Sequence, residues 1–424
     1  MQLRDGVSRR NFFKTAVAVG GATALSACLE RSKADVPIGD GDVPERQHAW
    51  NDHLRRDEHG NVRVPYHHAL LLFDYTGDGI DEDRPTVEEV FGSLERAYEW
   101  SHEGLLFTVG YSPYYFDRFD EPLGVELPEP EPLSSFENPE LDKADAVVHL
   151  ASDHASVVLE AEEALTGDRE EANGVVVETD LTGVFEKAER RTGFVGEGLP
   201  AQHQNVEGVP EDEPVPDDSP LYMGFKSGFK ENQATEDDVT LGDDAGAFAG
   251  GATQHVSHLH LDLERWYDDQ SRHERVSKMF CPAHADDGKV EGAGHNLGSS
   301  SGVDDCEDAE ESARQHGTVG HTQKAKRARE DGRPPLLRRD FDSTDPGRFD
   351  TAAGEHAGVH FVSLQEEIDD FVRVREAMNA DGIVDETDVS PQGENGILQY
   401  VMTRRRGNYL LPPRSLRALP RPSP

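Results

Sequence analysis

The residues best suited to chemistry are a histidine and two arginines in the last third of the chain. His321 opens the basic segment HTQKAKRAR, and Arg338 and Arg339 end the segment LLRR. An imidazole can ligate a haem iron, and a nearby arginine can stabilise the charge on an oxygen that leaves a peroxide. The plainer alternatives are a surface or structural histidine and a helix face whose basic side chains are solvated.

A glycine-containing segment, Gly224 to Gly228 (GFKSG), lies upstream of these residues. Because glycine has no Cβ, its two glycines would let the backbone approach a flat ligand closely. Without further context, a plain turn explains the same spacing.

Three other patterns suggest binding sites, and each has a simpler explanation. The stretch from Asp74 to Asp83 resembles the start of a calcium loop, but Pro85 stands where the loop needs a bidentate glutamate. His258 and His260 alternate on a predicted strand, where partly buried histidines are commoner than metal ligands. The basic run at residues 404–406 favours internal ion pairs, or contacts to haem propionates, over RNA binding.

The first 28 residues have the pattern of a twin-arginine export signal. Arg9 and Arg10 precede an apolar stretch that is too short to span a membrane but suits a signal peptide. The stretch ends in LSAC, which resembles a lipobox, so that Cys28 would carry a lipid. We therefore expect export through the twin-arginine pathway and a lipid anchor on the outer face of the cytoplasmic membrane.

The two remaining cysteines, Cys281 and Cys306, lie 25 positions apart. Outside the cell they could form a disulfide, which would stabilise the fold by roughly 3 kcal/mol. Two unrelated free thiols fit the sequence equally well.

The composition is strongly acidic, with 84 Asp and Glu against 42 Lys and Arg and a net charge of −42. So negative a chain is not expected to bind nucleic acid. Its carboxylates would repel one another at low salt, whereas molar salt would screen them. This Lys-poor composition is typical of proteins from extremely halophilic archaea.

Apolar runs and helical spacing predict the elements that must position the candidate residues. In the first half they predict strands at residues 68–75, 104–111, 144–151 and 174–178 and helices at 85–101 and 154–165. This β-α-β-β-α-β order is that of a split βαβ, or ferredoxin-like, unit. The second half repeats it, with strands at 254–263 and 358–364 and helices at 262–280 and 365–380.

The predicted fold class is α+β, with two ferredoxin-like domains built on antiparallel sheets. An acidic, Pro-rich stretch at residues 209–220 indicates the boundary between them. The predicted segments are a signal at 1–28, a polar tether at 29–46, an N-terminal domain at 47–215 and a C-terminal domain at 216–424. The last includes an acidic surface insertion at 281–320.

Taken in order, several segments resemble the dye-decolorizing (DyP-type) haem peroxidases. That family carries a GxxDG motif, a proximal-histidine segment, an ILRR segment and a final strand and helix. The segments GFKSG, GHTQKAKRA, LLRR and GVHFVSLQEEIDDF follow in that order at similar spacing. Further similarity lies in LLFTVGYSPYYFDRF, ADAVVHLASDHASVVLEAEEAL and QHVSHLHLDLERWYDDQSRHERV, so the resemblance spans most of residues 65–380. It implies a DyP-type fold of the dimeric α+β barrel superfamily.

The resemblance also implies site residues. His321 would be the proximal ligand to the iron of haem b, and Arg338 the distal arginine, with Arg339 as the fallback for that role. Gly224 and Gly228 fall on the glycines of the family motif and would lie beside the cofactor.

Ser227 falls on the catalytic aspartate of the family, and this is the main departure from its pattern. A serine hydroxyl can hydrogen-bond a peroxide, but it cannot take its proton as a carboxylate can. The replacement therefore favours haem binding over peroxidase turnover.

The function that the resemblance implies is that of an exported haem peroxidase, which oxidises an organic donor with hydrogen peroxide. The alternative is a degenerate, non-catalytic lipoprotein of the same fold that binds haem or another ligand. A substrate-binding lipoprotein of a transporter is disfavoured, because its strands and helices would alternate in a parallel α/β order. Besides peroxide, the donor and the membrane, a second copy of the chain is a possible partner.

Overall fold

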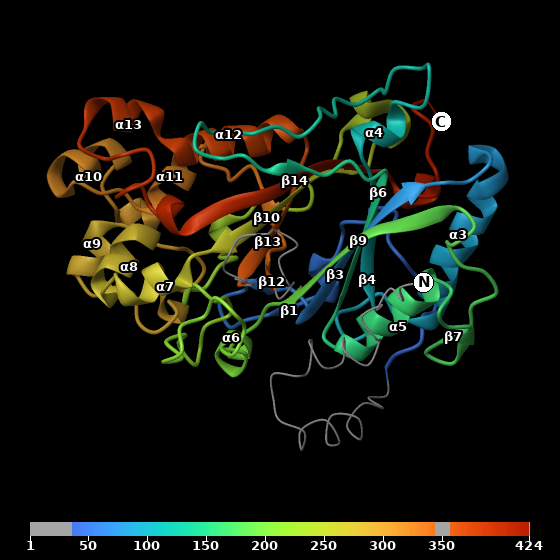
Figure 1. Cartoon of the computed structure of the whole chain (residues 1–424), viewed down its shortest axis with the longest axis horizontal. Coiled ribbons are helices and arrows are strands. Elements are labelled where there is room, and N and C mark those ends of the chain that lie inside the picture. The colour runs from blue at the N-terminus through green and yellow to red at the C-terminus, as the bar shows by residue number, and fades with distance from the viewer. Residues whose placement is uncertain (1–35, 344–356, 424) are drawn as a thin grey trace, which may run out of the picture.

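The structure, a computed structural model, describes residues 36–343 and 357–423. In these residues the long strands of both halves form one sheet, with helices packed around it (Figure 1). The predicted α+β class is confirmed. The predicted signal segment, including Arg9, Arg10 and Cys28, lies outside the described residues.

The N-terminal half has the predicted order of elements, and its strands pair in the order β9–β3–β6–β4. All three pairings are antiparallel. With the strands counted along the chain, this is the order 4-1-3-2 of a ferredoxin-like unit. The main elements are β3 (His67–Tyr75), α3 (Ile80–Ala97), β4 (Leu106–Tyr111), β6 (Ala146–Ser152), α5 (Ala155–Leu165) and β9 (Phe185–Phe194).

The predicted fourth strand at residues 174–178 is wrong. Val175–Val176 form only β8, which pairs with β7 (Glu171–Ala172) in a separate small hairpin. The fourth strand is β9, whose charged sequence FEKAERRTGF gives no apolar run. Its charges have partners inside the fold, because Arg190 binds Glu162 and Arg191 binds Asp142.

The helix predicted from Pro85 begins earlier, at Ile80, and includes Pro85 in its interior. Its first turn holds Asp81, Glu82 and Asp83, which are favourable at the positive end of a helix dipole. The stretch that resembles a calcium loop is therefore a strand end, a turn and a helix start. The helical spacing is confirmed, because the buried residues of α3 are Val87, Val90, Phe91, Ser93, Leu94 and Ala97.

The C-terminal half repeats the topology, with its strands in the order β14–β10–β13–β12. Its sheet strands are β10 (Ala252–Leu261), β11 (Leu337–Arg338), β12 (Phe341–Ser343), β13 (Gly358–Gln365) and β14 (Val401–Leu411). The helix predicted at 262–280 is divided into α7 (Leu263–Asp268) and α8 (Arg272–Met279), and the helix predicted at 365–380 is α12 (Ile368–Asn379). β14 was not predicted, because the first half of its sequence is polar.

The two ferredoxin-like halves are joined edge to edge by two short seams. At one seam β12 pairs with β9 through two residues of each strand, and at the other Leu410 of β14 pairs with Tyr111 of β4. Because β10 pairs with both β13 and β14, the path of strands closes on itself. The strands of the two predicted domains thus form one closed sheet, and a short parallel strand, β5 (Glu140–Leu141), is added to β14.

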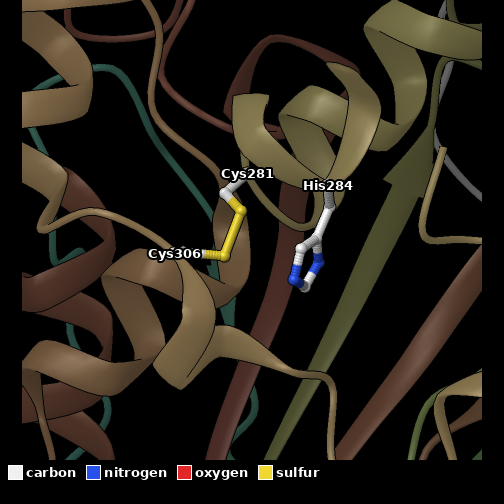
Figure 2. Close-up of side chains that lie close together, drawn as sticks. All are labelled: Cys281, His284 and Cys306. Carbon is white, nitrogen blue, oxygen red and sulfur yellow. A yellow bond between two sulfur atoms is a disulfide. The ribbon is translucent and has the colours of Figure 1, made fainter. Parts of the chain in front are cut away.

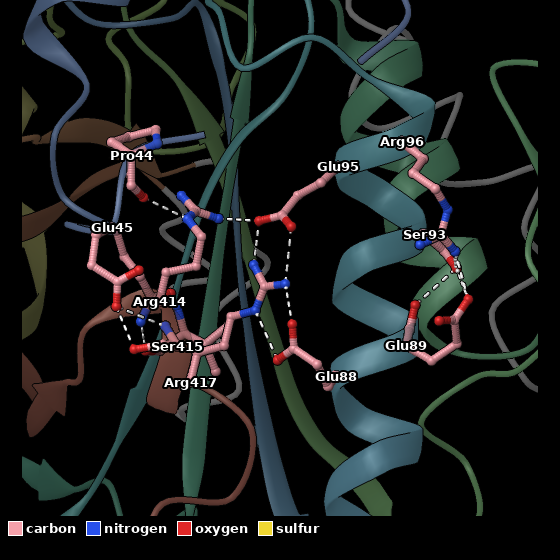
Figure 3. Close-up of polar contacts among 12 residues, drawn as sticks. Pro44, Glu45, Glu88, Glu89, Ser93, Glu95, Arg96, Arg414, Ser415 and Arg417 are labelled. Atoms are coloured by element: carbon pink, nitrogen blue, oxygen red, sulfur yellow. Dashed lines mark hydrogen bonds and ion pairs between the residues drawn. The ribbon is translucent and has the colours of Figure 1, made fainter. Parts of the chain in front are cut away.

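Residues 36–46, which were predicted to belong to a tether, pack against the body instead. Val36 and Val43 lie against the N-terminal core. Arg414 donates hydrogen bonds from its backbone N–H to Glu45 O and from Nε to Pro44 O (Figure 3). Side-chain composition does not predict these contacts, because backbone carbonyl oxygens accept the hydrogen bonds.

The segment at 281–320, predicted as an acidic surface insertion, contains short helices and a buried disulfide. Cys281 and Cys306 are bonded, with their Cα atoms 6.2 Å apart, and His284 lies beside them (Figure 2). Its helices are α9 (Pro282–Asp286) and α10 (Ala309–His316), and α11 (His321–Arg327) follows it. This segment is packed through small buried residues and the disulfide, so its sequence lacks the apolar periodicity of a longer helix.

The remaining described elements are short. Besides several 3-10 turns, they are β1 (Arg55–Arg56), β2 (Val62–Arg63), α4 (Pro113–Phe116), α6 (Leu199–Gln202) and α13 (Asp381–Glu386). No helix within residues 36–343 or 357–423 combines the length and the apolar character that a membrane crossing requires.

Candidate functional site

A cavity of about 580 Å³ lies against the sheet of the C-terminal half. It is lined by β10, β13 and β14, by α11 and α12, and by the segment at residues 221–232. Its volume lies within the roughly 300–1,000 Å³ of typical cofactor and small-molecule sites. The cavity brings together three of the predicted site residues, His321, Arg338 and Ser227.

The period of two along a strand decides which side chains reach this cavity. Its lining residues from β10 and β13 have odd numbers: Ser257, Leu259, Leu261, Val359 and Phe361. His258 and His260 are therefore on the opposite face, where the His258 ring lies 4.5 Å from that of His360. Among the described residues, no cluster of three or more metal-binding side chains includes either of them.

His321 is the first residue of α11, and the glycine before it is required by packing. A Cβ on Gly320 would lie 1.8 Å from the carbonyl oxygen of Phe280. The Gly320 N–H donates to Gln323 Oε1 at 2.7 Å, which closes the first turn of the helix. This close contact with Phe280 places the imidazole at the cavity wall.

The imidazole of His321 is held neutral and has an accessible nitrogen. Burial, together with Lys324 and Arg338, lowers its pKa to about 3. Its Nδ1 is fully buried without a hydrogen-bond partner among the described residues, so only Nε2 can face the cavity. A neutral imidazole with a free nitrogen can ligate a metal. A ligating imidazole usually donates a hydrogen bond from its other nitrogen, but the described residues offer no acceptor to Nδ1.

The two candidate arginines have different surroundings because they are neighbours in an extended segment. Arg338 lines the cavity, and its Nη1 lies 3.5 Å from Asp340 Oδ2. Arg339 does not line the cavity. Its guanidinium lies over the Trp50 ring, 4.0 Å from the ring centroid, and donates to His48 O. Adjacent residues of an extended segment point to opposite sides, so Arg338, and not Arg339, is placed at the cavity.

The glycine segment lies at the cavity, where Phe225, Lys226 and Ser227 line the wall but neither glycine does. Ser227 lines the cavity, and its hydroxyl has no hydrogen-bond partner among the described residues. Gly224 has a φ of +81°, and a Cβ there would lie 2.7 Å from the Tyr267 hydroxyl. A tyrosine, rather than a flat ligand, thus accounts for Gly224. Gly228, with a φ of +75°, lines a second cavity.

The second cavity, of about 110 Å³, adjoins the first. Five residues line both: Leu221, Lys226, Ser227, Arg338 and Asp340. Asp340 was not among the predicted site residues, although it stands two positions after Arg338. The only feature of the sequence that could have indicated a role for Asp340 is a carboxylate two positions after the candidate arginine.

The lining of the large cavity is basic, in contrast to the chain as a whole. It contains seven lysines or arginines and only two carboxylates, Glu137 and Asp340. Both Arg375 and Arg406 pair with Glu137. Arg404, from the basic run, lines the cavity without an ion-pair partner among the described residues. Such a cavity favours a ligand that carries negative charge.

These features fit a haem. The cavity has a suitable volume, apolar strand residues, a histidine with one accessible nitrogen, and an excess of cations that could bind two propionates. The buried Nδ1 of His321 lacks a hydrogen-bond partner among the described residues, as do Ser301 Oγ and two guanidinium nitrogens of Arg406 on the same lining. Nothing in the lining conflicts with an iron porphyrin.

Solved structures of dye-decolorizing peroxidases share this fold at low sequence identity. The protein from V. cholerae is 14% identical, with a TM-score of 0.55 over 87% of this chain and 99% of the other. A variant of DypB from Rhodococcus jostii in complex with heme is 14% identical, with a TM-score of 0.54 over 88% and 97%. Ferric DtpA from Streptomyces lividans is 17% identical, with a TM-score of 0.55 over 82% and 89%.

Two further comparisons concern sequence. The model of a family described as "Family of unknown function (DUF7405)" matches residues 65–413. None of the curated proteins matches the chain.

Proposed function

The chain belongs to the family DUF7405, and from this premise we propose that it is a haem-binding protein that reacts with hydrogen peroxide and oxidises an organic donor. The observation that carries the proposal is the cavity of about 580 Å³, in which His321, Arg338 and a cationic lining meet within a peroxidase-like fold. The heme in the DypB complex supports the choice of cofactor.

In the proposal, each residue has a role that its surroundings allow. His321 ligates the iron of haem b through Nε2, because its low pKa keeps the imidazole neutral. Arg404 binds a propionate, and Arg329 and Lys326 on the same lining add positive charge. Arg338 stabilises the oxygen that leaves the peroxide. The haem, when bound, supplies the redox chemistry that splits the O–O bond.

Ser227 supports the second candidate, a non-catalytic haem-binding protein. Its hydroxyl can donate a hydrogen bond to a ligand, but it does not titrate at physiological pH and cannot act as a general base there. Both candidates require haem binding, and they differ in whether peroxide changes the bound haem.

A titration with hemin, followed by the Soret absorbance, tests the proposal. We expect the wild-type protein to bind one hemin and His321→Ala to lose at least tenfold in affinity. The control is His316→Ala, because His316 lies nearby at the end of α10, half-exposed and outside the cavity. A wild-type protein without a hemin-dependent Soret band, or an unchanged affinity in His321→Ala, would contradict the assignment.

A further inference from the structure

A group beside Arg338 must move a proton if peroxide is to react there, and Ser227 cannot do so. We propose that Asp340 is this group, the general base and acid that handles the peroxide. The inference rests on the proposed haem peroxidase function and assigns a residue of that site.

The position of Asp340 is set by the gap between β11 and β12. The Arg339 N–H donates to Val362 O at 2.8 Å, and the Val362 N–H donates to Asp340 Oδ1 at 3.2 Å. These two bonds to β13 hold the carboxylate in place. The other oxygen, Oδ2, lies 3.5 Å from Arg338 Nη1, which is longer than a normal hydrogen bond. Oδ2 therefore remains able to accept a proton.

Asp340 also lies at both cavities. It lines both cavities, together with Ser227 and Arg338. The second cavity, of about 110 Å³, has room for several molecules the size of water or hydrogen peroxide but not for a haem. A peroxide molecule held in the second cavity would therefore lie beside Asp340 and Arg338.

The electrostatic surroundings suit a general base. Burial raises the pKa of Asp340 to about 6, and Arg338 and the Val362 N–H oppose this rise. A base with a pKa near the working pH is the most effective in proton transfer. The other charged or titratable groups that line the second cavity are Lys226 with its partner Asp57, the pair Arg63 and Glu197, Tyr66 and His295. The first cavity adds Glu137, His321, Lys326, Arg329, Arg375, Arg404 and Arg406.

The proposed step is a proton shuttle. The Asp340 carboxylate takes the proton from one oxygen of hydrogen peroxide and returns it to the other oxygen. The O–O bond breaks, its electron pair goes to that second oxygen, and one water leaves. Arg338 stabilises the negative charge on this departing oxygen. Two one-electron oxidations of the donor, each with release of one proton, then reduce the remaining oxygen to a second water.

The test uses the hemin-loaded protein and two small acids that must lose a proton at the site, hydrogen peroxide and hydrogen cyanide. We expect Asp340→Asn to slow both associations by about 10²-fold and to remove an inflection near pH 6 from their rate–pH profiles. Asp340→Glu, which keeps a carboxylate, should retain the inflection. Adding Ser227→Asp to Asp340→Asn should restore at least tenfold of the lost rate.

The matched control is Asp342→Asn. Asp342 is buried two positions further along, lines neither cavity, and accepts a hydrogen bond from the Tyr222 N–H, which asparagine can also accept. We expect this variant to keep the wild-type rates and profile.

Failure of the proposed function and failure of the Asp340 assignment give different results. If wild-type protein takes up no hemin, the proposed function and the role of Asp340 both fall. If hemin binds normally but Asp340→Asn keeps the wild-type cyanide rate and pH profile, the assignment of Asp340 is overturned and the proposed function stands. The assignment is overturned in the same way if Ser227→Ala, rather than Asp340→Asn, removes the inflection.

Discussion

The buried ammonium group of Lys324 is bound to Asn395 twice, with Nζ 2.8 Å from both the backbone oxygen and Oδ1. A third bond runs to Met378 O, also at 2.8 Å. Lys324 lies one turn after His321 on α11, so these bonds fix the helix that carries the candidate haem ligand to the end of α12 and to the loop before β14.

Replacing Lys324 with methionine should therefore weaken both the fold and haem binding. The change leaves three buried oxygens without this donor, at a cost of about 1–3 kcal/mol for an unsatisfied group. We expect a lower thermal midpoint and weaker hemin binding. The control is Arg327→Met on the same helix, because Arg327 forms only a surface ion pair with Glu310. Equal effects in the two variants would contradict the positioning role.

The raised pKa of Asp340 predicts a pH dependence of stability. A carboxyl whose folded pKa is about 6, above its ordinary 3.8, favours the folded state while protonated and loses this contribution as the pH rises through that window. Without added haem, Asp340→Asn should gain stability relative to wild type between pH 4 and pH 7, by on the order of 2–3 kcal/mol. Urea unfolding at constant high salt measures this gain, and a pH-independent difference would refute it.

The disulfide predicts a cost of reduction. Cys281 and Cys306 close a loop of 25 residues, so replacing both with serine should lower the free energy of unfolding by about 3 kcal/mol. Reductant should destabilise the wild type by a similar amount and leave the double variant unchanged. Denaturant unfolding with and without reductant checks this. Identical curves for the wild type would show that the two thiols are unpaired in solution.

The net charge of −42 predicts a requirement for salt. The Debye length grows from roughly 3 Å at 1 M to about 10 Å at 0.1 M, so dilution lets the carboxylates repel one another across the surface. We expect the thermal midpoint to fall steeply as potassium chloride drops below about 1 M. A midpoint that stays flat down to low salt would reject the halophilic interpretation.

The export signal is proposed from sequence alone and can be tested directly. Replacing Arg9 and Arg10 with lysine should block export, because the twin-arginine pathway reads the guanidinium pair. Replacing Cys28 with serine should release the protein into the medium. Fractionation of cells expressing each variant gives the answer, and a Cys28→Ser protein that stays membrane-bound would exclude the lipid anchor.

The sequence predicted those parts of the fold that its apolar periodicity encodes. β3, β6, α3 and α12 were recognised because buried residues recur at the spacing of a strand or helix. β9 and the first half of β14 were missed because their arginines and glutamates pair inside the protein. The sequence alone does not distinguish a charged side chain that pairs with a distant residue from one that is solvated.

The candidate site shows the same limit. Motif order singled out His321, Arg338 and Ser227, and all three line the same cavity. Whether Arg338 or Arg339 reaches the cavity depends on the side of the extended segment to which each side chain points. The importance of Asp340 depends on which cavities it lines. Neither property follows from residue type, because both arise from pairing with β13.

The closed sheet has a consequence for biosynthesis. β14 is the last long strand to leave the ribosome, yet it completes the edge of β4 in the first half and of β10 in the second. Until residue 411 has been made, both edges expose unpaired backbone groups, which invite association with other chains. A chain that ends before β14 should therefore aggregate rather than fold as half a molecule. During synthesis, neither half can complete its sheet until β14 has been made.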